Sequence, residues 1–235
     1  MNGNDTTRRV FLRQGGLLLS LAAALGPAAV WARTEKAAAP EISPAEDLMR
    51  EHGVLRRILL IYAEIDRRVQ AGLAFPLETL GAAAGLVHDF VENYHEKVEE
   101  EHVFPYFQRA RRLLPLVKIL RQQHQAGRRI TRYLQTHTSV GILLNEQNRR
   151  ELSRYLRAFM GMYRPHAARE DTVLFPAFRS LMPAKAYQEL GEKFEQIEHE
   201  KFGAQGFQKA VDRVAELEKT LGIHDLAQFT PHLPG

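Results

Sequence analysis

The sequence contains no cysteine. That absence excludes disulfide bonds, thiolate zinc sites, iron–sulfur clusters and cysteine nucleophiles. The sequence also lacks any sustained alternation of apolar and polar residues, which is the pattern of a half-buried strand. With 45% hydrophobic residues, the 235-residue chain still has enough apolar material for a sizeable core. We therefore expect an all-α protein.

Excess charge of one sign is also scarce. The formal net charge is +4, and about half of this excess lies in residues 1–32. Arginine pairs occur at 56–57, 111–112, 128–129 and 149–150, within helical patterns that are also rich in glutamate. We interpret these pairs as solvated helix faces, and we expect no nucleic-acid partner.

The N-terminal segment has the organisation of an export signal. Arg8 and Arg9 precede an uncharged run over residues 14–32, which ends in Val30-Trp31-Ala32. Small residues at those last positions predict cleavage after Ala32. The arginine pair followed by Val-Phe-Leu resembles a twin-arginine signal, and this resemblance implies a periplasmic or otherwise exported protein of bacterial type. An uncleaved membrane anchor is the alternative, but glycines and a proline make the run weakly apolar.

Helical periodicity organises the rest of the chain. Residues 33–43 are small, polar and proline-bearing, as in a linker. Ser43 can cap a first helix and Pro44 can occupy its first turn. The pattern predicts helices over residues 44–71, 77–111, 113–140, 145–180 and 183–221. Short connections between the first four predict an up-down four-helix bundle over residues 44–182. An additional C-terminal helix over 183–222 is expected to pack on it, followed by an irregular tail at 223–235.

One pattern rich in metal ligands occurs twice. His52 and His124 are separated by 72 positions, and each is followed four residues later by Arg-Arg-Ile. The motifs His95-x-x-x-Glu99 and His166-x-x-x-Glu170 are separated by 71 positions. An offset this constant indicates two similar helix pairs, each supplying two imidazoles and one carboxylate.

The six side chains suit a pair of metal ions. Residues four apart lie on one face of a helix, so each His-x-x-x-Glu motif can act as a small chelate. Four imidazoles and two carboxylates exceed what one ion usually needs, and a carboxylate can bridge two cations. Mixed nitrogen and oxygen donors suit iron, manganese or zinc rather than copper(I), calcium or magnesium. We expect two iron ions, with manganese or zinc as the less favoured choices.

These residues, in this order, resemble the hemerythrin-like, or HHE cation-binding, domain family. The resemblance covers roughly residues 44–182 and includes Val103-Phe104-Pro105 and Val173-Leu174-Phe175-Pro176 after the two motifs. It implies four helices around a non-haem di-iron centre. It also implies the following roles: terminal ligands His52, His95, His124 and His166, and bridging ligands Glu99 and Glu170.

The sequence departs from the oxygen-carrying members of that family at one position. Those proteins have a further histidine one turn after the third-helix ligand, where this chain has Arg128. The resemblance therefore favours members with fewer histidines, in which an acid directly after the second-helix histidine can join the site. That acid is Glu96 here, with Ala167 at the matching position of the second half. A one-residue step rotates by about 100° around a helix, so Glu96 stays an open candidate.

Three further histidines are weighed separately. His88 and His102 share a face with His95, but seven residues span about 10 Å, too far to bind the same ion. We consider His88 a group near the site or its entrance, and we expect His102 to serve packing. His199 could act as an outer contact or lid group, although a surface histidine is the more ordinary interpretation.

Tyr163, Pro105 and Pro176 are the last residues for which the sequence suggests a role at or near the site. Tyr163 precedes His166 by one turn, so its hydroxyl is a candidate hydrogen-bond donor to a bound oxygen species, against a default role in core packing. Pro105 and Pro176 each follow a bridging glutamate by six residues. We expect these prolines to bend or end the ligand helices.

Three functions fit this pattern. The first is an exported metal-binding protein that binds or senses oxygen, nitric oxide or iron, with no membrane association after signal cleavage. The second is a di-iron oxidoreductase that reduces oxygen, peroxide or nitric oxide, for which an open coordination position is needed. The sequence shows no haem motif and no cysteine cluster as an electron source, which favours the first. The third is a structural helical bundle without metal.

Overall fold

The computed structural model describes residues 42–137 and 145–231. The chain divides into two units, and the description below concerns the second, Ser43–Gly235. The predicted signal at 1–32 and nearly all of the predicted linker lie outside the described residues. The described residues contain helices and no strand, which confirms the prediction of an all-α protein. None of the described helices is both long enough and apolar enough to cross a membrane.

Helix α1, Pro44–Ala71, has the predicted bounds because both of its ends are encoded locally. The Ser43 side chain accepts a hydrogen bond from the backbone N–H of Glu46 at 3.3 Å, and Pro44 stands in the first turn. Both choices suit a helix start, where backbone N–H groups lack helical partners. Gly72 ends the helix in the left-handed conformation, with φ of 65°.

The second long helix runs without interruption from Leu77 to Ala110 but changes its winding. Its segments are α2 (Leu77–Leu86), η2 (Val87–His95), α3 (Glu96–Val98), η3 (Glu99–Val103) and α4 (Phe104–Ala110). The segments η2 and η3 are π-helical, and short π-helical turns are frequent at functional sites. Pro105 lies in the first turn of α4, so it does not end the helix. The wider π-helical turn directly before it removes the need for the hydrogen bond that proline cannot donate.

Two further long helices complete the set that surrounds the interior. Helix α5 spans Leu114–Thr136. A continuous helix then comprises α7 (Glu146–Arg169), the π-helical η4 (Glu170–Leu174) and α8 (Phe175–Arg179). Asn145 caps its start by accepting hydrogen bonds from the N–H groups of Gln147 and Asn148. Pro176, like Pro105, follows a π-helical turn and leaves the helix intact.

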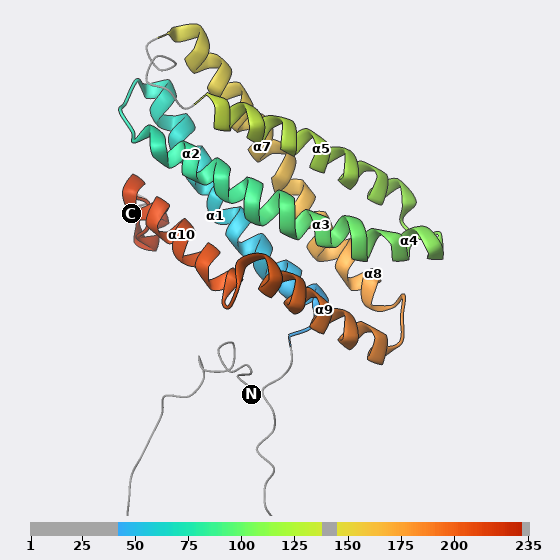
Figure 1. The fold of residues 1–235 in the computed structure, drawn as a ribbon. Helices are drawn as coiled ribbons and strands as arrows, with labels where there is room; N and C mark the ends of the chain where they lie inside the picture. Colours follow the sequence, from blue (N-terminus) through green and yellow to red (C-terminus); the bar gives the residue numbers. More distant parts are fainter. Residues whose placement is uncertain (1–41, 138–144, 232–235) are drawn as a thin grey trace, which may run out of the picture. The chain divides into compact units, whose positions relative to one another are not determined.

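These helices pack side by side around a common interior (Figure 1). Helix α1 lies along α7 and against η2, while α5 lies along α7 and against α2. Large side chains fill the interior, with Tyr62, Phe90, Phe159 and Tyr163 almost fully buried. The result is a helical bundle, as the sequence pattern predicts.

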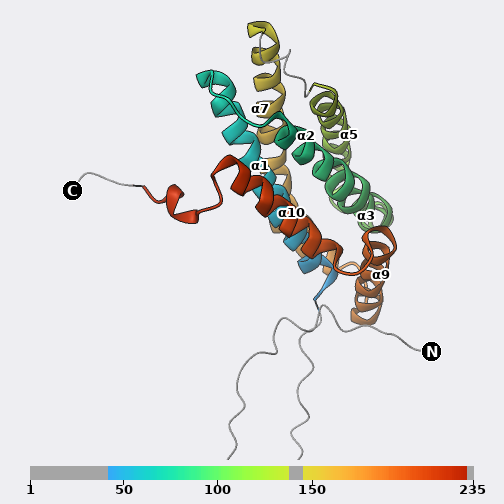
Figure 2. The same ribbon diagram turned by 60° about the vertical axis from the view of Figure 1, so that its left-hand side comes forward.

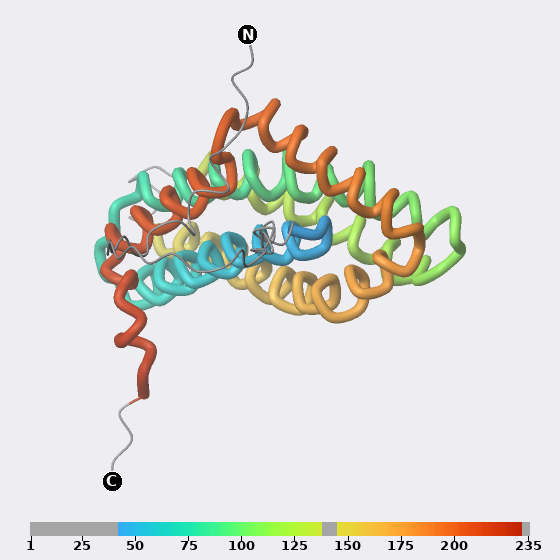
Figure 3. Tube along the Cα trace, turned by 90° about the horizontal axis from the view of Figure 1, so that it is seen from below, coloured from blue at the N-terminus to red at the C-terminus, as the bar shows by residue number. Residues whose placement is uncertain are grey.

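The prediction of a single C-terminal helix is wrong. The structure has two, α9 (Ala184–Phe202) and α10 (Gly206–Leu221), which run along the side formed by α1 and the Leu77–Ala110 helix (Figures 2 and 3). Gly203 and Gln205 have φ values of 69° and 66°, outside the helical region, so the chain turns between them. Apolar residues continue on both sides of this turn, which is why periodicity alone did not reveal it.

Polar contacts hold the C-terminal helices to the bundle. Arg57 of α1 donates two hydrogen bonds to Glu218 of α10, at 2.9 and 2.6 Å. The backbone N–H of Ala45 donates to the Tyr187 hydroxyl of α9 at 3.0 Å. In the described part of the predicted irregular tail, residues 226–229 form one short 3-10 helix, η5 (Leu226–Phe229).

Candidate metal centre

The six predicted ligands come from four long helices and meet in the interior. His52 lies on α1, His95 ends η2, Glu99 begins η3 and His124 lies on α5. His166 lies near the end of α7 and Glu170 begins η4. All six residues are buried, with at most 3% of the residue surface exposed.

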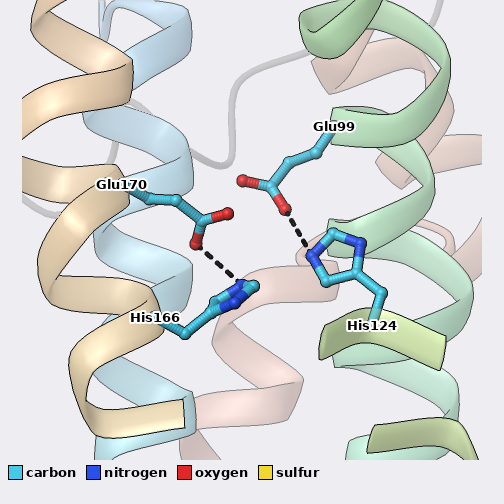
Figure 4. Close-up of side chains that lie close together, drawn as sticks. All are labelled: Glu99, His124, His166 and Glu170. Atoms are coloured by element: carbon cyan, nitrogen blue, oxygen red, sulfur yellow. Dashed lines mark ion pairs between the residues drawn. The ribbon is translucent and has the colours of Figure 1, made fainter. Parts of the chain in front are cut away.

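Donor atoms of these side chains form two overlapping groups. In one, Glu99, His124, His166 and Glu170 each offer an atom, and all four atoms lie within 4.8 Å of one another. Figure 4 shows these four side chains pointing toward one another. In the other, His52, His95 and Glu99 meet the same limit. The structure therefore brings the whole predicted set together.

Every ligand imidazole directs its Nε2 atom at the interior. The Nε2 atoms of His52 and His166 lie 3.3 and 3.1 Å from Glu170 Oε2. Those of His124 and His95 lie 3.4 and 3.8 Å from Glu99 Oε2. Each carboxylate thus faces one histidine from either half of the repeat. This is the arrangement that a bridging carboxylate between two ions requires.

The opposite ring nitrogen of each imidazole is hydrogen-bonded. Each Nδ1 atom lies 2.6–3.0 Å from a side-chain oxygen. The pairs are His52 with Asp171, His95 with Glu51, His124 with Glu100, and His166 with Gln123. A metal-binding histidine almost always donates its other N–H in this way, which fixes the tautomer and frees Nε2 for the ion.

Sequence reasoning missed these four partners, although a signal for them exists. Each either directly precedes His52 or His124 or directly follows Glu99 or Glu170. Glu51 and Gln123 are related by the 72-residue offset, and Glu100 and Asp171 by the 71-residue offset. Extending the repeat by one residue on each motif would have found them.

The two carboxylates are buried and face imidazole Nε2 atoms at ion-pair distance, but they have no hydrogen bond of normal geometry among the described residues. Within the described residues, His124 Nε2 also lacks a hydrogen-bond partner. A buried charge without partners is strongly unfavourable, so it is normally paired or bound to a metal. These unsatisfied atoms, with their mixed nitrogen and oxygen chemistry, fit a pair of cations.

The pKa values of the buried acids and imidazoles are shifted because these groups lie close together and away from water. Burial raises the pKa of Glu99 well above its usual range, and the neighbouring Glu170 charge adds to this. Burial also acts to raise the pKa of Glu170, but His166 and His52 outweigh it and hold that pKa well below normal. Burial lowers the pKa of His124 to about 4. Burial also lowers the pKa of His95 well below normal, so the metal-free site keeps two imidazoles neutral, and a neutral imidazole nitrogen is available to a cation.

Glu96 lies outside the two donor groups described above, but one of its oxygens lies within 4.8 Å of donor atoms of Glu100 and His124. Its carboxylate accepts a hydrogen bond from the Tyr163 hydroxyl at 2.6 Å and pairs with the Arg128 guanidinium at 2.9 Å. Arg128 also pairs with Glu100 at 2.9 Å. Burial raises the pKa of Glu96 to about 8. Arg128, which stands at the position of the further histidine of oxygen-carrying members, is therefore ion-paired with Glu96, the open ligand candidate.

The suggested role of Tyr163 needs correction. Its buried hydroxyl donates to Glu96, so it is not directed at the cluster of six. The hydroxyl reaches Glu96 across Gly127 of α5, where a Cβ atom would lie only 2.0 Å from it. Gly127 is thus required for this contact, because any larger side chain would occupy the space of the hydroxyl.

The other histidines lie outside the cluster. His88 is exposed and hydrogen-bonds to Asp89 at 2.8 Å. The half-buried His102 packs near Phe194, with ring centroids 6.2 Å apart, and burial lowers its pKa. His199 is exposed on α9. None of the three contributes a donor atom to the two groups described above.

Comparison with known proteins agrees with this geometry. Residues 43–178 match the family model of the hemerythrin HHE cation binding domain. Proteins of Mycobacterium tuberculosis and Mycobacterium bovis, described as uncharacterized, are 46% identical over 190 residues, which is 81% of this chain and 74% of theirs. No solved structure matches the chain. From the family match and this identity, the chain belongs to the hemerythrin HHE cation-binding domain family.

Proposed function

We propose that this protein binds a non-haem di-iron centre and uses it to bind or sense oxygen, nitric oxide or iron. One observation carries the proposal: four imidazoles with occupied Nδ1 atoms direct their Nε2 atoms at two buried carboxylates that lack hydrogen bonds. In this proposal His52, His95, His124 and His166 are the terminal ligands. Glu99 and Glu170 are the bridges.

Two ions explain the donor set better than one. The rings pair as His52 with His95 and His124 with His166, with centroids 4.7 and 5.0 Å apart. Each pair could hold one ion, and the two carboxylates offset the repulsion between close cations in a medium of low dielectric constant. We further interpret α1, Leu77–Ala110, α5 and Glu146–Arg179 as an up-down four-helix bundle around this pair.

Iron is the metal we propose, with manganese or zinc less favoured, because imidazole and carboxylate donors suit all three. Bound iron supplies one-electron chemistry and coordination positions that six protein donors leave open. The protein's own contribution is to position and shield. Phe175 stacks on His52 and Phe104 on His124, each with centroids 5.6 Å apart. These rings hold the imidazoles in place and keep bulk water away from the centre.

A di-iron oxidoreductase acting on oxygen, peroxide or nitric oxide is the alternative. It is favoured by the small number of protein donors per ion, since Arg128 replaces a fifth histidine and is bound to Glu96 and Glu100 instead. Multiple turnovers of peroxide or nitric oxide by the loaded protein would support the enzyme. Stoichiometric and reversible ligand spectra without turnover would support the binding protein.

We also propose export by the twin-arginine route to the periplasm. The support is the Arg8-Arg9-Val-Phe-Leu pattern and the apolar run that ends at Ala32. Replacement of both Arg8 and Arg9 by lysine should retain the protein in the cytoplasm, as measured by cell fractionation. Unchanged export of that variant would reject this route.

Elemental analysis of the purified protein tests the metal proposal directly. We expect two irons per chain in the wild type. His124→Ala and Glu170→Ala should each lose at least one, because each removes a donor from the cluster. His88→Ala is the matched control, since this exposed histidine lies outside the cluster and should retain both. Metal-free wild-type protein after expression with abundant iron, manganese and zinc would reject the proposal.

A further inference from the structure

The duplicated site is built from duplicated contacts. His52 Nδ1 is bound to Asp171, and this acid also pairs with Arg56. In the other half, His124 Nδ1 is bound to Glu100, which pairs with Arg128. The arginine, the acid and the histidine correspond at the same offsets of 72 and 71. Up to this point the two halves are chemically alike.

The equivalence ends at the second histidine of each half. His95 Nδ1 lies 2.7 Å from a carboxylate oxygen of Glu51. Its counterpart, His166 Nδ1, lies 2.8 Å from the side-chain oxygen of Gln123. The geometry is the same, but the acceptor is an acid in one half and an amide in the other. One half therefore binds both of its imidazoles to carboxylates, whereas the other binds only one.

An acceptor of this kind acts on the metal through the imidazole. A hydrogen bond from Nδ1–H to a carboxylate is charge-assisted and stronger than one to a neutral amide. It draws the Nδ1 proton away from the ring and so makes Nε2 a better electron donor. His95 should thus be a stronger ligand than His166. The first histidines show the same trend in length, with 2.6 Å for His52–Asp171 and 3.0 Å for His124–Glu100.

We propose that the two metal positions are inequivalent, and that the ion held by His52 and His95 binds more tightly because Glu51 stands where the other half has Gln123. The inference rests on the proposed dinuclear centre. It identifies Glu51 and Gln123 as positioning residues that set the order in which the two positions fill.

Glu96 provides an internal comparison for this inference. It is a buried acid that directly follows His95, and the matching position in the second half of the repeat holds Ala167. Its oxygens, however, contact the Tyr163 hydroxyl and the Arg128 guanidinium rather than a ligand imidazole. Glu51 and Glu96 are thus two buried acids of one chemistry, of which only Glu51 is bound to a ligand ring.

The test is an anaerobic titration of metal-free full-length protein with Fe²⁺ in competition with a chelator. We expect the wild type to bind two ions with two resolved affinities. Glu51→Gln should weaken the tighter step by about 10- to 100-fold, the usual effect of losing such a partner, and bring the steps together. Gln123→Glu should strengthen the weaker binding step, which also brings the two affinities closer together. Glu96→Gln should keep the separation of the wild type.

The outcomes separate this inference from the function on which it rests. Two ions bound with one common affinity by the wild type would overturn the inequivalence and leave the dinuclear centre standing. Binding of no iron would overturn both. An equal loss of the tighter step in Glu96→Gln and Glu51→Gln would also overturn the inference, because buried charge alone would then explain the effect. Circular dichroism of each metal-free variant establishes that the helices are retained.

Discussion

Two buried groups of polar side chains lie between α1 and its neighbours, and they are stabilised differently. Asp66, beside α7, accepts hydrogen bonds from Ser153, Gln70 and Arg157. Glu99 and Glu170 in the metal centre accept none of normal geometry in the described part of the chain. The Asp66 group is satisfied by the protein itself. The acids of the metal centre face imidazole nitrogens instead of hydrogen-bond donors of normal geometry, which is compatible with cation binding.

Metal removal should give the largest difference between these groups. A ligand that binds only the folded state at a thousandfold excess over its Kd adds about 4 kcal/mol to the free energy of unfolding. We therefore expect iron to raise the melting temperature of the wild type markedly, as measured by calorimetry with and without a chelator. Glu170→Ala should lose this increment and Asp66→Asn should keep it. An equal increment in both variants would contradict the assignment of the centre.

Asp66→Asn should have the next largest effect, and it should not depend on iron. The substitution weakens a charge-assisted hydrogen bond with Arg157 and leaves a buried group less well matched to Ser153. A loss of about 1–3 kcal/mol is expected, measured by urea unfolding. The same loss should appear in metal-free and iron-loaded protein. A loss that appears only with iron would mean that the two groups are coupled.

Glu99→Gln should change the metal-free protein much less. The amide has nearly the shape of the acid, and the raised pKa of Glu99 already keeps its carboxyl neutral without metal, so the substitution changes little. Urea unfolding in the presence of a chelator should therefore give a free energy within about 1 kcal/mol of the wild type, or a higher one. A clear destabilisation without metal would show that Glu99 has protein partners and would weaken the contrast with Asp66.

The smallest effect is expected at Glu64, which extends the comparison to the surface of α1. Hydrogen bonds from Arg67 and Arg68 lower the pKa of Glu64 to about 2. A lowered folded-state pKa adds stability above the ordinary value near 4.5, and this is lost as the pH falls toward 2. The effect is screened by solvent, so Glu64→Gln should cost less than about 1 kcal/mol at pH 7. Unfolding curves at pH 7 and pH 3 should show this difference shrink.

Much of this architecture can be predicted from local sequence signals such as helix caps and motif spacing. Ser43, Pro44 and Gly72 fix the ends of α1, because caps depend on residues adjacent in sequence. The constant offset between the two motifs identified all six residues of the cluster. The turn at Gly203 was missed, since an apolar period continues through it and only the backbone conformation reveals the break. The π-helical turns before Pro105 and Pro176 were missed for the same reason.

The sequence alone determined which side chains form the buried cluster, because residue type and helical spacing select the candidate donors before any folding is considered. Only the tertiary structure decided what each donor faces. Glu51, Glu100, Gln123 and Asp171 reach the imidazoles from other helices. Tyr163 is turned to Glu96 and away from the centre. Such pairings depend on how helices rotate and pack against one another, and helical periodicity within a single segment does not specify that rotation.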